Sequence, residues 1–165
     1  MSSVVDRVGR MYGKLSSAAE LLRSPLLLAI RLYWGLGFFH AGLGKLMNLD
    51  RTTGFFRDLG IPAPGVNAMM AGTTECVGGL LLALGLGSRL VAIPLIVTMI
   101  VAYGTAHADA VRGLFSDPDA FVTADPFPFL LASLIVLAFG PGALSIDALI
   151  ARIREKDGGR GGVAN

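Results

Sequence analysis

The sequence predicts an all-α integral membrane protein: a four-helix bundle with an N-terminal amphipathic interfacial helix and short interfacial helices in its two outer loops. Hydrophobic residues make up 53% of the 165 residues and charged residues only 16%, against roughly 25% charged in a typical soluble domain. The mean hydropathy is +0.65. Four nearly uncharged apolar runs are long enough to cross a bilayer, which takes roughly 17–25 residues in a helix. None of these runs alternates like a barrel strand or carries the polar stripe of a soluble bundle helix.

The predicted membrane domain covers residues 26–147. Its four spans cover about 26–44, 68–87, 90–108 and 127–144. The first span begins too late and is too long for a simple cleavable signal, and no small-residue cleavage site follows it. We therefore expect the first span to be retained.

The segments that flank this domain are more polar. In residues 1–25 apolar side chains recur at helical spacing among charged ones, which predicts an amphipathic helix lying in the membrane interface. A partner-binding or merely solvated helix is the alternative, and Pro25 is expected to reset the chain direction. Residues 148–165 are basic and then glycine-rich, which predicts a disordered cytoplasmic tail.

The two longer connections between spans have amphipathic patterns of their own. The pattern of residues 52–59 predicts a short amphipathic helix that ends at Gly60 and Pro62. Residues 109–126, which include Pro118, have a similar amphipathic pattern. We expect short helices at the outer interface from both connections. The span–loop–span layout occurs twice, but the residue identities give only a hint of an internal repeat.

Basic residues predict the orientation of the spans. With four spans, both termini lie on one side, and that side holds Arg7, Arg10, Lys14, Arg23, Arg89, Arg152, Arg154, Lys156 and Arg160. The opposite side holds Lys45, Arg51, Arg57 and Arg112. Because Lys and Arg favour the cytoplasmic side, we expect a bacterial-type inner membrane protein with both termini in the cytoplasm.

Several function classes are excluded by composition. The single Cys76 rules out an internal disulfide framework, a CxxC dithiol and a cysteine-based zinc cluster. A net charge of +2 is too small to drive nucleic-acid binding. No haem, flavin or nucleotide-binding motif is visible, so the chain has no electron carrier of its own.

Ionisable groups at membrane depth are costly, and each needs a structural or functional reason. Five are placed there, namely Arg31, His40, Lys45, Glu75 and His107. At about 1.5 Å per residue, His40, Lys45, Glu75, His107 and the following Asp109 fall in the outer half of the bundle. Arg31 falls nearer the inner half, where Asp147 is a candidate partner.

Three interpretations of the outer cluster stay open. In the first, Glu75 is a buried anion paired with Lys45 or His40 that fastens two helices together. In the second, Glu75, His40 and His107 line a pocket for a quinone headgroup or a proton, since imidazole and carboxylate exchange protons near neutral pH when partly buried. A metal site is the least supported interpretation, because the ligand types lack tight spacing, and we expect none.

Two further groups of residues have packing roles. Trp34 is too deep for an interfacial belt, so it is expected to pack in the bundle or face a quinone, and Tyr103 is an interfacial anchor or a pocket wall. Gly35, Gly37, Gly42 and Gly44 in the first span, with Gly78, Gly79, Gly85 and Gly87 in the second, are expected to allow close approach of the helices.

Three stretches together resemble the DoxX family of small four-helix membrane proteins. They are RLYWGLGFFHAGLGKLMN from Arg31, then GFFRDLGIPAP, then ECVGGLLLALGLGSRLVAIPLIVTMIVA, and the closing GPGALSID up to Asp147 has the same style. The resemblance implies a four-span inner-membrane protein that is often met beside oxidoreductases. Some relatives are membrane subunits of thiosulfate:quinone oxidoreductase, and others belong to membrane complexes that manage thiol and radical stress.

Two functions from different classes follow. The first is a non-autonomous membrane subunit or anchor of an oxidoreductase complex, quinone-linked or related to thiol and radical stress, with quinone as the ligand. The second is a non-catalytic scaffold or small-solute carrier, whose polar cluster is structural or a translocation site. The expected partners are the lipid bilayer, a soluble redox protein and further copies of the chain.

Overall fold

The computed structural model describes residues 2–160, and every regular element within this range is a helix. The helices are α1 (Ser2–Met47), α2 (Leu49–Asp58), α3 (Pro64–Leu84), α4 (Ser88–Thr105), α5 (Ala108–Arg112), α6 (Pro118–Val122), α7 (Pro126–Phe139) and α8 (Ile146–Arg160). The all-α prediction is confirmed, and so are the short helices in both long connections.

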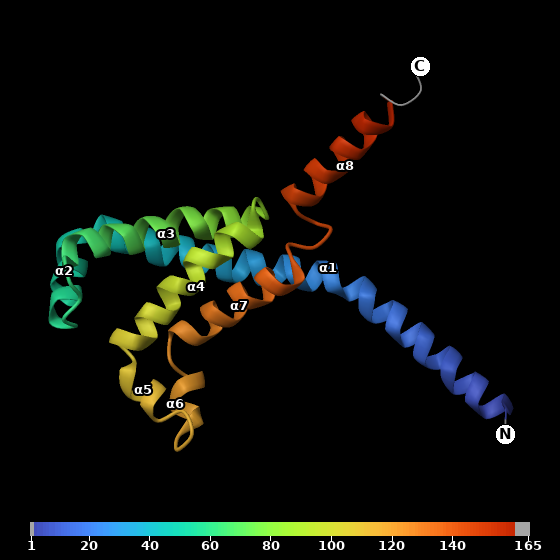
Figure 1. Ribbon diagram of the computed structural model, residues 1–165, viewed down its shortest axis with the longest axis horizontal. Coiled ribbons are helices and arrows are strands. Elements are labelled where there is room, and N and C mark those ends of the chain that lie inside the picture. The colour runs from blue at the N-terminus through green and yellow to red at the C-terminus, as the bar shows by residue number, and fades with distance from the viewer. Residues whose placement is uncertain (1, 161–165) are drawn as a thin grey trace.

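The long helices form a bundle with two distinct ends (Figure 1). The C-terminal part of α1 lies beside α3, and α4 and α7 pack next to them. One end carries α2, α5 and α6, while the N-terminal part of α1 and the whole of α8 project from the other end. Both described ends of the chain therefore leave the bundle on one side.

Three helices are long and apolar enough to cross a membrane by length and composition. They are residues Glu20–Met47 of α1, Pro64–Leu84 and Ser88–Thr105. Their exposed hydrophobic side chains, such as Leu36, Val77 and Ile100, suit contact with lipid. These three helices overlap the first three predicted spans.

The fourth predicted span is helical over only part of its length. Helix α7 has 14 residues and ends at Phe139, so it covers about 21 Å, against a hydrocarbon core of about 30 Å. The helix stops because Gly140 takes a φ of 76° and Gly142 a φ of 80°, with Pro141 between them. The rest of the predicted span, up to residue 144, is a non-helical segment.

Helix α1 runs through Pro25, where the sequence predicted a break between an interfacial helix and the first span. Proline removes one backbone donor and commonly bends a helix without ending it when the flanking residues favour helix. Leucine-rich segments flank Pro25 on both sides. Figure 1 shows that the two parts of α1 run in different directions, so the change of direction occurs within one helix.

The C-terminal segment differs from the predicted disordered tail. Residues Ile146–Arg160 form α8, which projects away from the bundle. The segment IDALIARIREK contains strong helix formers, and Asp147 in its first turn favours the helix dipole. Residues 161–165 of the predicted tail lie outside the described residues.

Close contact between α1 and α3 depends on glycines that face each other. A Cβ atom on Gly35 would lie 2.8 Å from both Ala83 N and Gly79 O. A Cβ atom on Gly42 would overlap the backbone of Cys76 and come within 2.6 Å of Gly72 O. The predicted packing role is confirmed for Gly35, Gly42 and Gly79, whereas a Cβ on Gly44 meets nothing within 4 Å.

The hydrophobic core joins all four long helices. Phe38 from α1, Leu82 from α3, Leu95 and Met99 from α4, and Val136 from α7 form one buried cluster. Phe129 of α7 packs against it, with its ring centroid 4.7 Å from that of Phe38. This cluster separates two polar regions at opposite ends of the bundle.

Candidate functional site

The facing stripes of α1 and α3 carry charged residues, two on α1 and one on α3. On α1 the stripe runs through Arg31, Gly35, Phe38, Gly42 and Lys45, which recur at three- and four-residue spacing. On α3 it contains Gly72, Glu75 and Gly79. Lys45 and Glu75 meet because the glycines let the two backbones approach closely.

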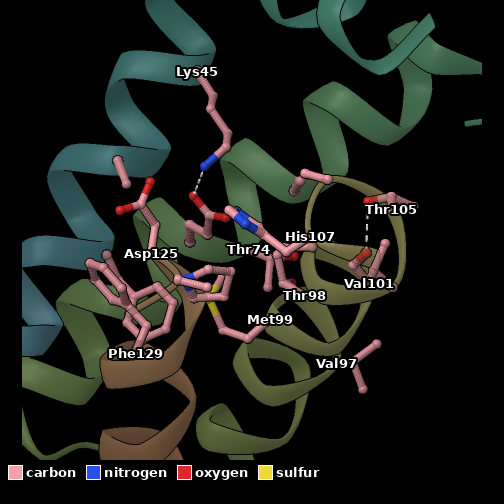
Figure 2. A pocket seen from close by; sticks show the side chains of 18 of the residues that line it. Lys45, Thr74, Val97, Thr98, Met99, Val101, Thr105, His107, Asp125 and Phe129 are labelled. Atoms are coloured by element: carbon pink, nitrogen blue, oxygen red, sulfur yellow. Dashed lines mark hydrogen bonds and ion pairs between the residues drawn. The ribbon is translucent and has the colours of Figure 1, made fainter. Parts of the chain in front are cut away.

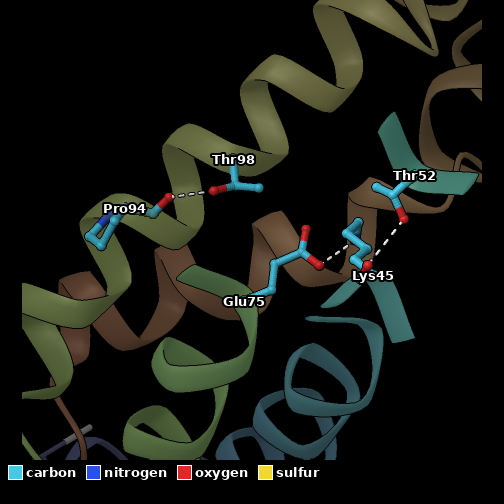
Figure 3. A network of polar contacts seen from close by, with 5 residues as sticks. All are labelled: Lys45, Thr52, Glu75, Pro94 and Thr98. Atoms are coloured by element: carbon cyan, nitrogen blue, oxygen red, sulfur yellow. Dashed lines mark hydrogen bonds and ion pairs between the residues drawn. The ribbon is translucent and has the colours of Figure 1, made fainter. Parts of the chain in front are cut away.

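Lys45 Nζ donates a hydrogen bond to Glu75 Oε2, forming an ion pair (Figure 3). Glu75 is 2% exposed, whereas the Lys45 side chain keeps 30% exposure. The second carboxylate oxygen of Glu75 points away from Lys45 in Figure 3 and accepts no hydrogen bond from the described residues. One partner of the pair is thus buried, and the other reaches the edge of a cavity.

The cavity beside this pair has a volume of about 1140 Å³. Its walls come from α1, α2, α3, α4 and the segment from α6 into α7, and they are mainly apolar. Phe55 and Phe56 of α2, Met70 of α3 and Val97 of α4 are among them. The cavity, Lys45 and Glu75 together are called the Glu75 site below.

A few polar groups converge on the Glu75 site (Figure 2). Thr74 comes from α3, Thr98 from α4, His107 from the turn after α4, and Asp125 from the start of α7. Thr98 Oγ1 donates to Pro94 O at 2.9 Å (Figure 3), so this hydroxyl is held by a carbonyl one turn earlier. An apolar chamber with few polar groups is the usual form of a small-molecule site.

Aromatic side chains form one wall of the site. The rings of Trp34 and Phe129 lie edge to face, with centroids 5.0 Å apart. Both residues line the cavity. Trp34 therefore packs in the bundle and also faces the cavity.

The structure brings together some of the predicted outer residues but not all of them. Lys45, Glu75 and His107 line one cavity, and His107 lies with its ring 6.1 Å from that of Tyr103. His40 is exposed on another face of α1, where its Nδ1 donates to Leu36 O at 2.7 Å. Between the two predicted partners for Glu75, the structure selects Lys45.

Tyr103 and Asp109 each contact a neighbouring residue of the chain and do not line the cavity. The hydroxyl of the buried Tyr103 donates to Phe121 O at 2.7 Å, and the two rings stack at 4.5 Å. Tyr103 thereby ties α4 to α6 behind the cavity wall. Asp109 is exposed and pairs with Arg112 at 3.1 Å, one turn along α5.

The opposite end of the bundle holds Arg31, which is 1% exposed. Arg31 Nη2 donates to Leu144 O at 2.6 Å in the non-helical segment after α7. The predicted partner Asp147 makes other hydrogen bonds, accepting from Gly87 N at 2.8 Å and Ser88 N at 3.1 Å. Asp147 thus caps the N-terminus of α4, and the two residues fix the same junction without an ion pair.

Sequence reasoning missed several residues of the Glu75 site. Thr74, Thr98, Asp125 and Phe129 line it, but none is charged within a span, so depth alone did not single them out. Asp125 stands directly before Pro126 at the start of α7, and this position next to a predicted span was the available signal. Across the described residues, no group of three or more His, Cys, Asp or Glu is placed to hold a metal ion.

Comparisons with known proteins agree with this architecture. A family model described as DoxX matches residues 26–108. The chain is 32% identical over 143 residues to the "Uncharacterized membrane protein Rv3486" of Mycobacterium tuberculosis, covering 82% of this chain and 88% of that protein. It is also 32% identical over 83 residues to the "Putative oxidoreductase CatD" of Bacillus subtilis, covering 50% of this chain and 60% of that protein. No solved structure gives a significant match.

Proposed function

Because this chain belongs to the DoxX family of membrane proteins, we propose that it is the membrane subunit of a quinone-linked oxidoreductase complex and that its Glu75 site binds the quinone headgroup. The observation that carries the proposal is the buried Lys45–Glu75 pair opening onto an apolar cavity of about 1140 Å³. The similarity to a relative named as an oxidoreductase supports the same class of function.

The residues of the site fit a quinone. The Lys45 ammonium offers a donor for a ring carbonyl, and Glu75 holds that ammonium at the cavity edge. Trp34 and Phe129 offer aromatic surface for a flat ring, and Val97 and Met70 offer apolar surface for its tail. Several of the lining side chains, including Val97, Val101 and Met70, are exposed, so a ligand dissolved in the bilayer can enter from the side.

Reduction of a quinone to a quinol consumes two electrons and two protons. The electrons would come from a soluble redox partner, because the chain has no carrier motif of its own. Protons would pass through the groups that line the cavity, with the free oxygen of Glu75 and the imidazole of His107 as the candidates. The chain would thus bind and orient the quinone while its partner supplies the electrons.

Co-purification from native membranes tests this proposal. The chain should be extracted with a mild detergent, and its bound lipids and proteins identified by mass spectrometry. Bound quinone, strongly reduced in Glu75→Gln but kept in Asp109→Asn, is the expected result. Asp109 is the matched control because it is an exposed acid outside the cavity lining. A clean homo-oligomer without quinone or a redox partner would contradict the proposal and favour a scaffold or carrier.

A further inference from the structure

Two arginines meet at the C-terminal end of α7, away from the Glu75 site. Arg23 Nη2 of α1 donates to Phe139 O at 3.0 Å, and Arg89 Nη2 of α4 donates to Ala138 O at 3.3 Å. These carbonyls belong to consecutive residues in the last turn of α7, where backbone acceptors lack helical partners. The two guanidinium groups are therefore gathered around one helix end.

The hydrogen bonds to α7 use only a few of the N–H donors of these two arginines. A guanidinium has five N–H donors, and each arginine donates one hydrogen bond to α7. Both residues are exposed, and neither pairs with a carboxylate among the residues that the structure describes. The neighbouring acid, Asp147, is engaged by the amides of Gly87 and Ser88. This end of α7 thus carries uncompensated positive charge with free donors.

Both arginines lie close to the start of a predicted span, where lipid headgroups are expected. Arg23 precedes the first predicted span, and Arg89 is the second residue of α4. Exposed apolar side chains lie next to both in the sequence, with Leu26 one turn after Arg23 and Leu90 directly after Arg89. Charged donors flanked by exposed leucines suit an amphiphile whose headgroup is anionic and whose tails are apolar.

We propose that Arg23 and Arg89 bind the phosphodiester of an anionic phospholipid headgroup at this end of the bundle. Guanidinium groups bind phosphate oxygens with charge-assisted, often bidentate hydrogen bonds. The distribution of basic residues predicts that this end faces the cytoplasmic leaflet, where anionic lipids create a negative surface potential. This site is independent of the quinone site, because it uses other residues at the other end of the bundle.

Lipid-dependent thermal stability of the purified full chain tests the site. Melting temperature should be measured in phosphatidylcholine nanodiscs and in nanodiscs with added phosphatidylglycerol. The wild type should melt higher with phosphatidylglycerol, and each of Arg23→Gln and Arg89→Gln should lose most of this increase, because each removes a charge-assisted contact to the headgroup. Arg112→Gln is the matched control, since Arg112 is an exposed arginine at the other end, and it should keep the full shift.

Each variant is compared with its own melting temperature in phosphatidylcholine, so the loss of an α7 cap does not obscure the result. Each single variant keeps one of the two arginine contacts to the end of α7, so both are expected to fold. An undiminished phosphatidylglycerol shift in both single variants would overturn the proposal. A shift of equal size from inorganic phosphate in phosphatidylcholine would also overturn it, because the ligand would then be the free anion.

Discussion

The two ends of the bundle treat buried charge in opposite ways. At the Glu75 site, a carboxylate and an ammonium pair beside a large cavity, and one carboxylate oxygen is left without a partner among the described residues. At the Arg31 end, the guanidinium is bound to the backbone at Leu144, and the Asp147 carboxylate caps α4. The Glu75 end leaves polar groups accessible to a ligand. The Arg31 end encloses them, so that Nη2 joins two segments of the chain while the buried Nε and Nη1 have no partner among the described residues.

The contrast also shows that burial of a charge does not identify a functional site. Arg31 is as buried as Glu75. Its surroundings are filled, because a Cβ atom on Gly85 would overlap the Arg31 guanidinium and approach Ser145 Cβ to 2.6 Å. Only the charge that borders an open volume can exchange its partner for a ligand without unfolding the helix contact.

The largest expected effect comes from crowding the Arg31 end. Gly85 has a φ of 72°, and Gly85→Ala would add left-handed strain to the overlap with Arg31. We expect the free energy of unfolding to fall by about 2–6 kcal/mol, because the strained backbone costs about 1–3 kcal/mol and overpacking costs about 1–3 kcal/mol. Gly87 has a φ of 58°, and a Cβ atom there would meet only Val91, at 4.0 Å. Gly87→Ala should therefore be destabilised by the backbone strain alone, without overpacking. Equal losses of thermal stability in detergent would contradict a filled Arg31 end.

Breaking the ion pair at the Glu75 site should have the next largest effect. Removing one partner of a buried pair typically costs about 3–5 kcal/mol, but Lys45 reaches the cavity edge, so Glu75→Gln should cost about 1–3 kcal/mol. Lys45→Met should recover part of the loss in the double variant, because the two effects are non-additive. His40→Leu should combine additively with Glu75→Gln, since His40 contacts Leu36 instead. Recovery by His40→Leu and none by Lys45→Met would refute the pairing.

A smaller loss is expected when the α4 cap is weakened. Asp147→Asn keeps one side-chain oxygen for Gly87 or Ser88 and loses the charge that favours the helix N-terminus. The expected cost is about 1–2 kcal/mol. Asp109→Asn, an exposed acid outside any such cap, should leave the melting temperature unchanged. Indistinguishable melting of the two variants would show that Asp147 does not fasten the Arg31 end.

The smallest effect concerns the wall behind the cavity. Tyr103→Phe removes the hydrogen bond to Phe121 O but keeps the stacked rings. The loss should be about 0.5–1.5 kcal/mol, the usual net contribution of one hydrogen bond. A much larger loss in a thermal melt would mean that α6 is held to the bundle by this bond alone.

Much of the fold could be predicted from the sequence, because span length and apolar composition reflect the bilayer directly. The continuity of α1 past Pro25 could not, since a proline bends some helices and ends others according to the helix strength of its flanks. The same limit applies to α7, where Gly140 and Gly142 stop the helix before the apolar run is over. Hydropathy measures the apolar run and does not register backbone conformation.

The sequence predicted how deep the charged residues lie in the membrane, but not which face of the helix each one occupies. His40 and Lys45 lie at similar depth. They are five residues apart, so their side chains point in directions about 140° apart around the helix axis, and both cannot face Glu75. The glycines contained the missing signal. Lys45 continues the stripe through Gly35 and Gly42 that packs on α3, and His40 lies off that stripe.

The most direct test of the difference between the two ends is quinone binding monitored by tryptophan fluorescence. Trp34 is the only tryptophan in the chain and lines the cavity, so a bound quinone should quench it. Titration of the protein in nanodiscs with a short-chain quinone should give saturable quenching in the wild type and in Asp147→Asn, and little saturable quenching in Glu75→Gln and Lys45→Met. Unchanged saturable quenching in Glu75→Gln, or only linear quenching in the wild type, would contradict the assignment of the ligand site to the Glu75 end.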